Sequence, residues 1–316
     1  MNSPSPPIRH AGFFTGPDGK IRPIWRVFMY TVASAVAITA VTLLVAIVVE
    51  AFLPGAMRAK TTVALMMAHP SMFILLYAAT DMALIMLAWL FLAAFDRRSF
   101  RALGLWFYPR WGRELLAGVG LGAAALGLGV AISVALRATV FHGATELSLH
   151  TVLGLAKIGV LLLFAAASEE LLFRGYAFQR LVDSVGALWA VLLTSLFFGV
   201  AHLLNPAVTP LSTANTVLAG VVLSVAYLKT RALWLPLGLH WAWNFTMGPI
   251  LGLPVSGLRV TPSLFQADSA GPQWLAGGAY GPESGVVLSV VSVVLIVWMA
   301  RTRKIAPSLA MAEVLK

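Results

Sequence analysis

The chain of 316 residues lacks cysteine altogether and has few charged residues. The absence of cysteine excludes disulfide bonds, thiolate nucleophiles and thiolate metal sites. Charged residues make up only 11% of the chain and hydrophobic residues 59%, whereas a soluble domain carries about 25% charged residues. A water-soluble fold of this length would hold more apolar side chain than one core could bury. We therefore expect a polytopic membrane protein with lipid as its main solvent.

The N-terminus lacks the pattern of a cleavable signal peptide, because the first 25 residues are polar and rich in proline and glycine. Beyond them, eight apolar segments follow, each near the roughly 20 residues that a bilayer requires. They cover residues 27–53, 71–95, 113–136, 151–181, 187–204, 212–228, 232–249 and 284–300. The expected fold is all-α, a membrane bundle of about eight transmembrane helices.

The net charge of +10 would suit a nucleic-acid partner, but its distribution favours membrane topology. Of the 22 lysine and arginine residues, 17 lie in the tails and loops on one side of the expected bundle and 4 on the other, with Lys157 inside a segment. Basic loops of membrane proteins stay in the cytoplasm. We therefore expect both termini in the cytoplasm, membrane lipid around the helices and no nucleic-acid partner.

Polar residues inside the expected helices are few, and most of them fall in three segments. They are Glu169, Glu170 and Arg174 in the fourth segment, His202 in the fifth, and His240 and Asn244 in the seventh. A carboxylate at membrane depth is costly, and such residues usually face a bundle interior or a wet cavity and mark a working site. Two further intramembrane residues, Asp81 and Lys157, are interpreted as helix contacts, and Trp241 and Trp243 as packing or pocket residues.

The two adjacent glutamates are expected to have different partners. Neighbouring residues on a helix point about 100° apart, so Glu169 and Glu170 do not face the same point. Glu170 and Arg174 are four residues apart and can pair on one helix face. This division leaves Glu169 for chemistry.

Helix arithmetic places Glu169 and His202 at one depth. The fourth and fifth segments form a hairpin that turns near residues 183–186, with Glu169 16 residues before residue 185 and His202 17 residues after it. At about 1.5 Å per residue, both lie roughly 25 Å from the turn. His240 follows the turn at residues 229–231 by only about ten residues, or roughly 15 Å. It meets the other two only if the hairpin protrudes further into the cytoplasm.

Three motifs on these segments resemble those of a known family. EELLFR (169–174), FGVAH (198–202) and HWAWN (240–244) are similar to the EExxxR, FxxxH and HxxxN/D motifs of the CPBP family. Its members are the CAAX-protease and bacteriocin-processing, or Abi, intramembrane proteases. The motifs occur in the family's order, each on its own segment, and the asparagine in the third lies within its usual variation.

Hydropathy, the distribution of basic residues and the resemblance together divide the chain into five regions. Residues 1–26 are a cytoplasmic tail and 27–149 are N-terminal transmembrane helices. Residues 150–250 are the catalytic core, and 251–283 form an extracytoplasmic loop rich in glycine and proline. Residues 284–316 contain the last transmembrane helix and a basic cytoplasmic tail. The sequence leaves open whether the loop is disordered or caps the bundle.

The resemblance also implies roles for the four residues expected to be catalytic. Glu169 would be the general base that activates a water molecule, with His202 as its partner. His240 and Asn244 would stabilise the oxyanion. The chain would then be an intramembrane endopeptidase that hydrolyses a peptide bond near the membrane surface, in a peptide or a membrane-anchored protein. It would reside in a bacterial inner or plasma membrane.

Three further residues of the motifs would support the site. Arg174 would hold Glu170 and the local helix geometry, and Phe198 would shape the wall of the cavity. A zinc ion remains an alternative to a metal-free mechanism, since two imidazoles and a carboxylate form a common catalytic zinc set. Its ligands would be His202, His240 and Glu169, although the chain lacks the HExxH spacing.

Two other functions stay open at this stage. The same polar cavity would let a non-catalytic membrane immunity or scaffold protein bind a peptide or a partner. A transporter or proton relay would also use buried glutamate and histidine, but the sequence shows no pair of broken helices. The sequence contains no sign of prenyl recognition, so it does not identify the substrate.

Overall fold

The structure is a computed structural model that describes residues 12–16, 18–52 and 69–314. Residues 1–11 and 17 of the expected N-terminal tail and residues 53–68, with the basic residues Arg58 and Lys60, lie outside the described residues. Arg9 and Lys316, which also entered the charge count, lie outside them as well.

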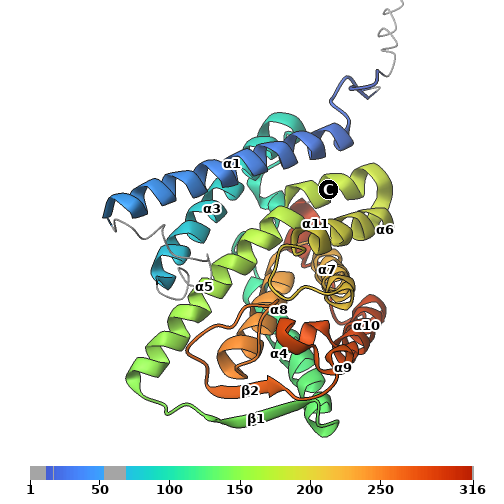
Figure 1. The fold of residues 1–316 in the computed structure, drawn as a ribbon. Helices are drawn as coiled ribbons and strands as arrows, with labels where there is room; N and C mark the ends of the chain where they lie inside the picture. The colour runs from blue at the N-terminus through green and yellow to red at the C-terminus, as the bar shows by residue number, and fades with distance from the viewer. Residues whose placement is uncertain (1–11, 17, 53–68, 315–316) are drawn as a thin grey trace, which may run out of the picture.

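Each expected segment corresponds to one long helix of the described chain (Figure 1). The helices are α1 (Pro23–Phe52), α3 (Pro70–Phe91), α4 (Trp111–Ala135), α5 (Leu149–Phe173), α6 (Tyr176–Ala201), α7 (Pro210–Thr230), α8 (Trp234–Phe245) and α10 (Val286–Arg301). The π-helical turns η2 (Leu92–Asp96) and η4 (Thr246–Ile250) extend α3 and α8. Shorter helical elements are η3 (Phe100–Leu103), α9 (Gln273–Ala276), η5 (Gly278–Tyr280), η6 (Pro282–Ser284) and α11 (Leu309–Val314).

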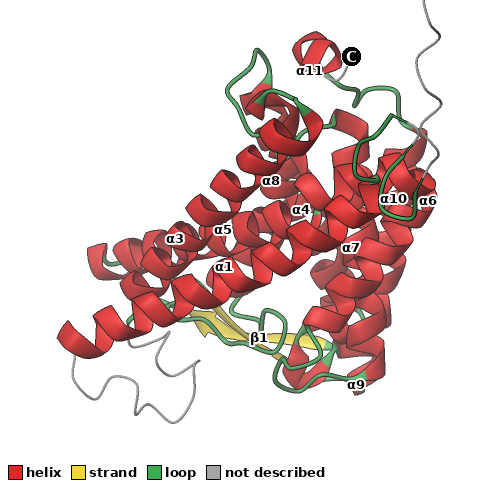
Figure 2. Cartoon of the chain, turned by 90° about the horizontal axis from the view of Figure 1, so that it is seen from above, coloured by secondary structure: helices red, strands yellow, loops and turns green. Residues whose placement is uncertain are grey.

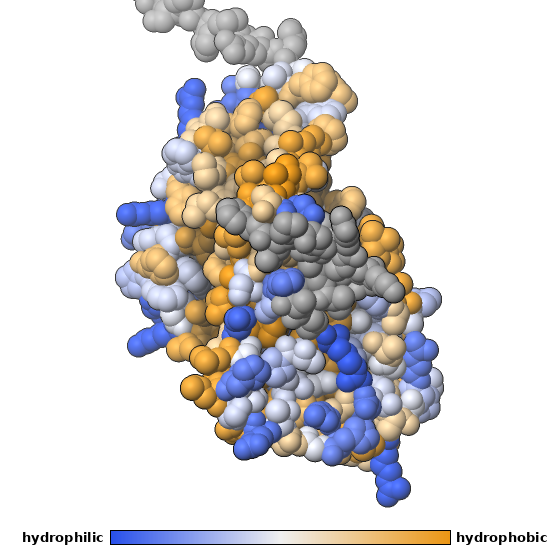
Figure 3. All heavy atoms as spheres, turned by 60° about the vertical axis from the view of Figure 1, so that its left-hand side comes forward, coloured by the Kyte–Doolittle hydropathy of each residue, from blue (hydrophilic) through white to orange (hydrophobic). Residues whose placement is uncertain are grey.

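Five described segments are long and apolar enough to cross a membrane, and one of them, residues 149–201, contains both α5 and α6. α10 is a shorter apolar helix. Only 11% of the most apolar part of α1 is buried against the protein, so the remaining apolar surface requires lipid. Figure 3 shows hydrophobic side chains spread over one side of the bundle and hydrophilic ones gathered at its lower end. The prediction of an all-α, multi-pass membrane bundle is confirmed.

Local sequence signals set the ends of several helices. Ser148 caps α5 by accepting a hydrogen bond of 3.1 Å from the backbone N–H of Thr151. Thr209 and Ser212 form a reciprocal capping box at the start of α7. Such caps satisfy backbone N–H groups that have no partner within the helix. These capping signals are local, and a hydropathy profile does not detect them.

α5 ends earlier than the sequence predicts, and the expected segment 151–181 is therefore wrong as a continuous helix. The helix ends at Phe173, the chain changes direction at Arg174 and Gly175, and α6 begins at Tyr176. A Cβ atom at Gly175 would lie 2.2 Å from the carbonyl oxygen of Leu171, so the tight break requires glycine. The hairpin reversal follows at Gly186, inside the predicted turn, with φ +82°.

The loop after α8 folds as a cap on one end of the bundle. Its strand β2 (Phe265–Ser269) pairs antiparallel with β1 (Thr139–Ala144), from the connection between α4 and α5. Leu253, Val255 and Ala267 are buried in the main hydrophobic core. Figure 2 shows the strands and α9 at one end of the bundle and α11 at the other. Of the two alternatives that the sequence left open for 251–283, the structure shows the cap.

A carboxylate shared by two arginines joins α1, α3 and α6. Asp96, at the end of η2, lies 2.5 Å from Arg26 and 3.2 Å from Arg180, measured between side-chain oxygen and nitrogen atoms. All three side chains are less than 10% exposed. A buried ion pair contributes little beyond its own desolvation, but removing one partner leaves a charge uncompensated. The cluster therefore fixes the N-terminal helices against the hairpin that carries the site.

Glycines let α4 and α8 approach each other through their backbones. A Cβ atom at Gly118 would lie 2.2 Å from the carbonyl oxygen of Leu235, and one at Gly122 would lie 2.3 Å from that of Leu239. Gly238 makes the corresponding approach from α8. Small residues four apart are a common basis of helix packing in membranes, where the hydrophobic effect does not drive association. This contact fixes the position and rotation of α8.

We predict that Gly122→Ala destabilises the protein, because the added methyl group forces α4 away from α8 at a cost of about 1–3 kcal/mol. The measurement is the midpoint of thermal unfolding of purified protein in detergent. Gly120→Ala is the matched control on the same helix, since a Cβ atom there has no heavy atom within 4 Å. Equal midpoints for the two variants would contradict the proposed packing.

Candidate active site

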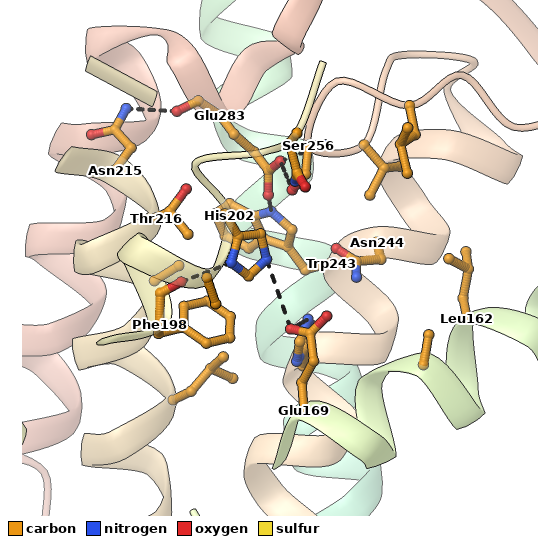
Figure 4. Close-up of a pocket in the computed structure, with 18 of the residues that line it drawn as sticks. Leu162, Glu169, Phe198, His202, Asn215, Thr216, Trp243, Asn244, Ser256 and Glu283 are labelled. Carbon is orange, nitrogen blue, oxygen red and sulfur yellow. Dashed lines mark hydrogen bonds and ion pairs between the residues drawn. The ribbon is translucent and has the colours of Figure 1, made fainter. Parts of the chain in front are cut away.

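A cavity of about 330 Å³ lies among α5, α6, α7, α8 and the cap. Its wall is mostly apolar, with Leu161, Phe198, Leu223 and Leu239 among the lining residues. A small number of polar side chains also reach it (Figure 4). An apolar pocket with a few convergent polar groups is the usual form of a ligand or active site.

The structure brings Glu169 together with both histidines. Its Oε2 atom lies 3.9 Å from Nε2 of His202 and 3.7 Å from Nε2 of His240. The Glu169 side chain is 35% exposed and lines the cavity, yet Oε2 has no hydrogen-bond donor among the described residues. Glu169 and His202 come from the two arms of the hairpin and meet as expected, although the break at Arg174 and Gly175 interrupts the continuous helix that the hairpin arithmetic assumed.

His202 is held by the end of its own helix. Its Nδ1 atom lies 2.8 Å from the carbonyl oxygen of Phe198. A carbonyl oxygen only accepts, so Nδ1 carries the proton and a neutral ring presents the lone pair of Nε2 to Glu169. The Phe198 ring packs on the imidazole with 4.6 Å between centroids. Phe198 therefore holds His202 through both its backbone and its side chain.

Glu170 and Arg174 form a fully buried ion pair beneath the cavity. Oε1 of Glu170 accepts a hydrogen bond of 3.1 Å from Nη1 of Arg174, and both side chains are at most 1% exposed. Arg174 also donates to the carbonyl oxygen of Gly220 at 3.0 Å, and its guanidinium lies 4.6 Å from the centroid of the Phe198 ring. The pairing expected from the spacing is present, with α6 and α7 as additional partners.

Glu170 has a second partner that sequence reasoning missed. The same Oε1 atom lies 2.8 Å from Nδ1 of His240. Since the carboxylate accepts, Nδ1 of His240 carries the proton and Nε2 faces Glu169. Glu170 is therefore both the partner of Arg174 and the group that orients His240. The i,i+4 spacing revealed the first contact, but the second depends on how α8 is rotated against α5.

Asn244 lies one turn after His240 on α8 and lines the same cavity (Figure 4). Its amide makes no hydrogen bond to the residues that the structure describes, so its N–H donors are available to a ligand. On α3, Asp81 accepts a hydrogen bond from Ser168, the residue before Glu169. This bond fixes α3 against α5 next to the site.

Oε2 of Glu169 and Nε2 of each histidine therefore converge, and all three atoms are acceptors when both rings are neutral. Ligands of tetrahedral zinc, with bonds of about 2.0–2.2 Å, lie about 3.3–3.5 Å apart. The observed separations of 3.7 and 3.9 Å are longer. Within residues 69–314, no group of three or more such side chains meets the spacing of a metal site. The donor set has the right chemistry for zinc, but its spacing as it stands does not fit the ion.

Sequence reasoning missed the contribution of the cap. Glu283, in η6, accepts a hydrogen bond of 3.1 Å from Nε1 of Trp243 and two of 2.8 Å from the backbone N–H and the hydroxyl of Ser256. Glu283 and Ser256 line the cavity together with Trp243. No motif or periodicity marks residues in such a loop, and only the non-local fold of the cap brings them to the site.

Comparison with known proteins gives one finding about the family. Residues 151–246 match a family model described as Type II CAAX prenyl endopeptidase Rce1-like. The matched region runs from α5 into η4 and contains all three motifs, so the resemblance to the CAAX-protease family is confirmed. No curated protein and no solved structure matches the chain.

We predict that the two adjacent glutamates differ in their effect on stability. Glu170→Ala leaves the guanidinium of Arg174 buried without its carboxylate and should lower the free energy of unfolding by about 3–5 kcal/mol. Glu169→Ala removes a carboxylate whose Oε2 has no donor and should leave stability unchanged or higher, as is common at active sites. Thermal unfolding in detergent measures both. A larger loss for Glu169→Ala would refute this assignment.

Proposed function

We propose that the protein is an intramembrane endopeptidase of the CAAX-protease type. It hydrolyses a peptide bond of a peptide or membrane-anchored protein near the membrane surface. The observation that carries the proposal is the position of the Glu169 carboxylate between two imidazole Nε2 atoms, at 3.7 and 3.9 Å. The three side chains line a largely apolar cavity inside the region that matches the family model.

The proposed general base is Glu169, with His202 as its partner. The separation of 3.9 Å between Oε2 and Nε2 exceeds a direct hydrogen bond and suits two acceptors that share one water molecule. The water would donate to both atoms, which directs its oxygen lone pair into the cavity. Transfer of one water proton to Glu169 would accompany attack on the peptide carbonyl. The Phe198 carbonyl supports this role by keeping the His202 proton on Nδ1.

His240 and Asn244 would stabilise the oxyanion. In the neutral ring Nε2 of His240 is an acceptor, so donation to an oxyanion requires the imidazolium form. The Glu170 carboxylate at Nδ1 favours that form, because it places a negative charge on the far side of the ring. Asn244 supplies an amide N–H one turn away. Each well-aimed donor in such a site contributes about 3 kcal/mol to stabilisation of the transition state.

A zinc-dependent mechanism is the alternative with the same residues. Small movements of His202, His240 and Glu169 would be required to shorten their separations to those of a zinc site. A bound zinc would supply Lewis acidity and a nucleophilic water.

We also propose that both termini face the cytoplasm of a bacterial inner or plasma membrane and that the cap faces the other side. The basic residues support this orientation: on the cap, Arg259 is paired with Asp268, so the cap adds little net positive charge. Because the chain contains no cysteine, single introduced cysteines can test the orientation by thiol labelling. Ala270→Cys, exposed on the cap, should react with a membrane-impermeant thiol reagent in intact cells. Ser184→Cys, exposed in the α6 hairpin, should react only after the membrane is opened. The reverse labelling would overturn the orientation.

We predict that Glu169→Gln and His202→Ala give folded proteins that have lost peptidase activity. Loss of a positioned general base costs about 10²–10⁴-fold in rate. The measurement is cleavage of a peptide library by purified protein, with each peptide supplied with and without a C-terminal prenyl group. The control that should keep activity is Lys157→Ala, since the structure places Lys157 at an exposed position of α5 and not in the helix contact that the sequence suggested.

The same assay separates the alternatives. Equal cleavage by the wild type and Glu169→Gln would remove the peptidase proposal and leave a non-catalytic immunity or scaffold protein that binds through the cavity. Activity that is lost with a chelator and restored by zinc would establish the metal-dependent mechanism. Activity that persists with the chelator would support the metal-free one.

A further inference from the structure

The carboxylate of Glu283 is held in the cavity wall by neutral hydrogen-bond donors. It accepts one hydrogen bond from the Trp243 indole and two from Ser256. Its backbone carbonyl accepts another, of 2.7 Å, from the side chain of Asn215. Figure 4 shows Glu283 on the opposite side of the His202 ring from Glu169. The position of Glu283 is thus fixed by three different parts of the chain.

Among the described residues, no lysine or arginine side chain pairs with this carboxylate. Glu169 and Glu283 line the cavity, whereas none of the described lining residues is lysine or arginine. Arg174, close to the cavity, forms an ion pair with Glu170. Arg259, on the cap, forms an ion pair with Asp268, and neither of these two residues lines the cavity. In residues 69–314 no basic side chain forms an ion pair with Glu283.

Holding the cap together does not require a negative charge at this position. A neutral amide oxygen would also accept from Trp243 and Ser256, and it would avoid the cost of a carboxylate facing a low-dielectric cavity. A carboxylate in this position gains its counter-charge only when a cation enters the cavity. The indole of Trp243, which also lines the cavity, offers an aromatic surface that favours cations as well.

We propose that Glu283 is a specificity-determining residue that binds a cationic group of the substrate at the cap end of the cavity. The group is an ammonium or a guanidinium, from a lysine or arginine side chain or from the peptide's own amino terminus. Trp243 immediately precedes Asn244, so the Glu283–Trp243 bond sets the cation site at a fixed position relative to the proposed oxyanion donors. The inference rests on the proposed peptidase function.

The test uses one apolar leucine/alanine host peptide in which a single lysine, norleucine or glutamate occupies each position in turn. The wild type should favour lysine over uncharged norleucine at one position by about tenfold or more in kcat/KM, since close charge pairs at interfaces couple this strongly. Glutamate should be disfavoured there. Glu283→Gln should reduce the lysine preference to near one. If acetylation of the amino terminus lowers kcat/KM instead, and Glu283→Gln removes that effect, the cation is the terminal amine.

Two control variants separate charge recognition from support of the cap. Asp268→Asn removes a carboxylate of the cap outside the cavity lining and should keep both the activity and the preference. Ser256→Ala removes a donor to Glu283 but retains the charge, so it should keep the preference. If Ser256→Ala abolishes the preference as Glu283→Gln does, the role of Glu283 is structural and the proposal fails. It also fails if the wild type shows no lysine preference at any position and acetylation of the amino terminus leaves kcat/KM unchanged.

A binding measurement keeps the result independent of catalysis. The same peptides are titrated onto the Glu169→Gln protein in nanodiscs, with and without the additional Glu283→Gln change. Tighter binding of a lysine peptide that depends on Glu283, without cleavage by the wild type, would support the cation site and refute the peptidase. Cleavage by the wild type with equal binding and turnover of lysine and norleucine peptides would refute the cation site alone.

Discussion

The buried guanidinium of Arg174 is the constraint on which the rest of the site depends. A fully enclosed arginine inside a membrane bundle is tolerated only when its positive charge is paired. Here Glu170 supplies the charge, the Gly220 carbonyl accepts a hydrogen bond, and the Phe198 ring lies against the guanidinium. These partners belong to α5, α7 and α6. The ion pair therefore adds little net stability but allows only one arrangement of the three helices.

This arrangement also determines where α5 ends and how the proposed catalytic groups are presented. Arg174 follows the last helical residue, and the chain changes direction at Gly175, where a Cβ atom would collide with the carbonyl of Leu171. With Glu170 fixed toward the core, the helical rotation of about 100° per residue directs Glu169 to the cavity. One interaction thus separates two chemically identical neighbours into a buried structural group and an open one, the proposed general base.

The sequence predicts the helices well and the contacts between them only where both partners lie on one helix or one hairpin. Hydropathy locates the eight long helices of the described chain but misses the break between α5 and α6 at Arg174 and Gly175. Spacing alone predicts the Glu170–Arg174 pair, and the hairpin predicts that Glu169 and His202 meet. The contact of His240 with Glu170 was not predictable, because it depends on the rotation of α8, which Gly118 and Gly122 set through backbone contacts. The cap was not predictable either, because its polar contacts are non-local and follow no period.

The balance of charges around the proposed site explains why the same residues suit both a proton-based and a metal-based mechanism. Among the groups around the proposed site, Glu169 and Glu170 carry two negative charges against one on Arg174. With both histidines neutral, three acceptor atoms face one another without a donor. One added positive charge removes the imbalance, either as a proton on His240, where Glu170 stabilises it, or as a bound cation. The arrangement of these residues therefore favours a positive charge at this point. Whether a proton or a bound cation supplies that charge depends on what the cavity binds.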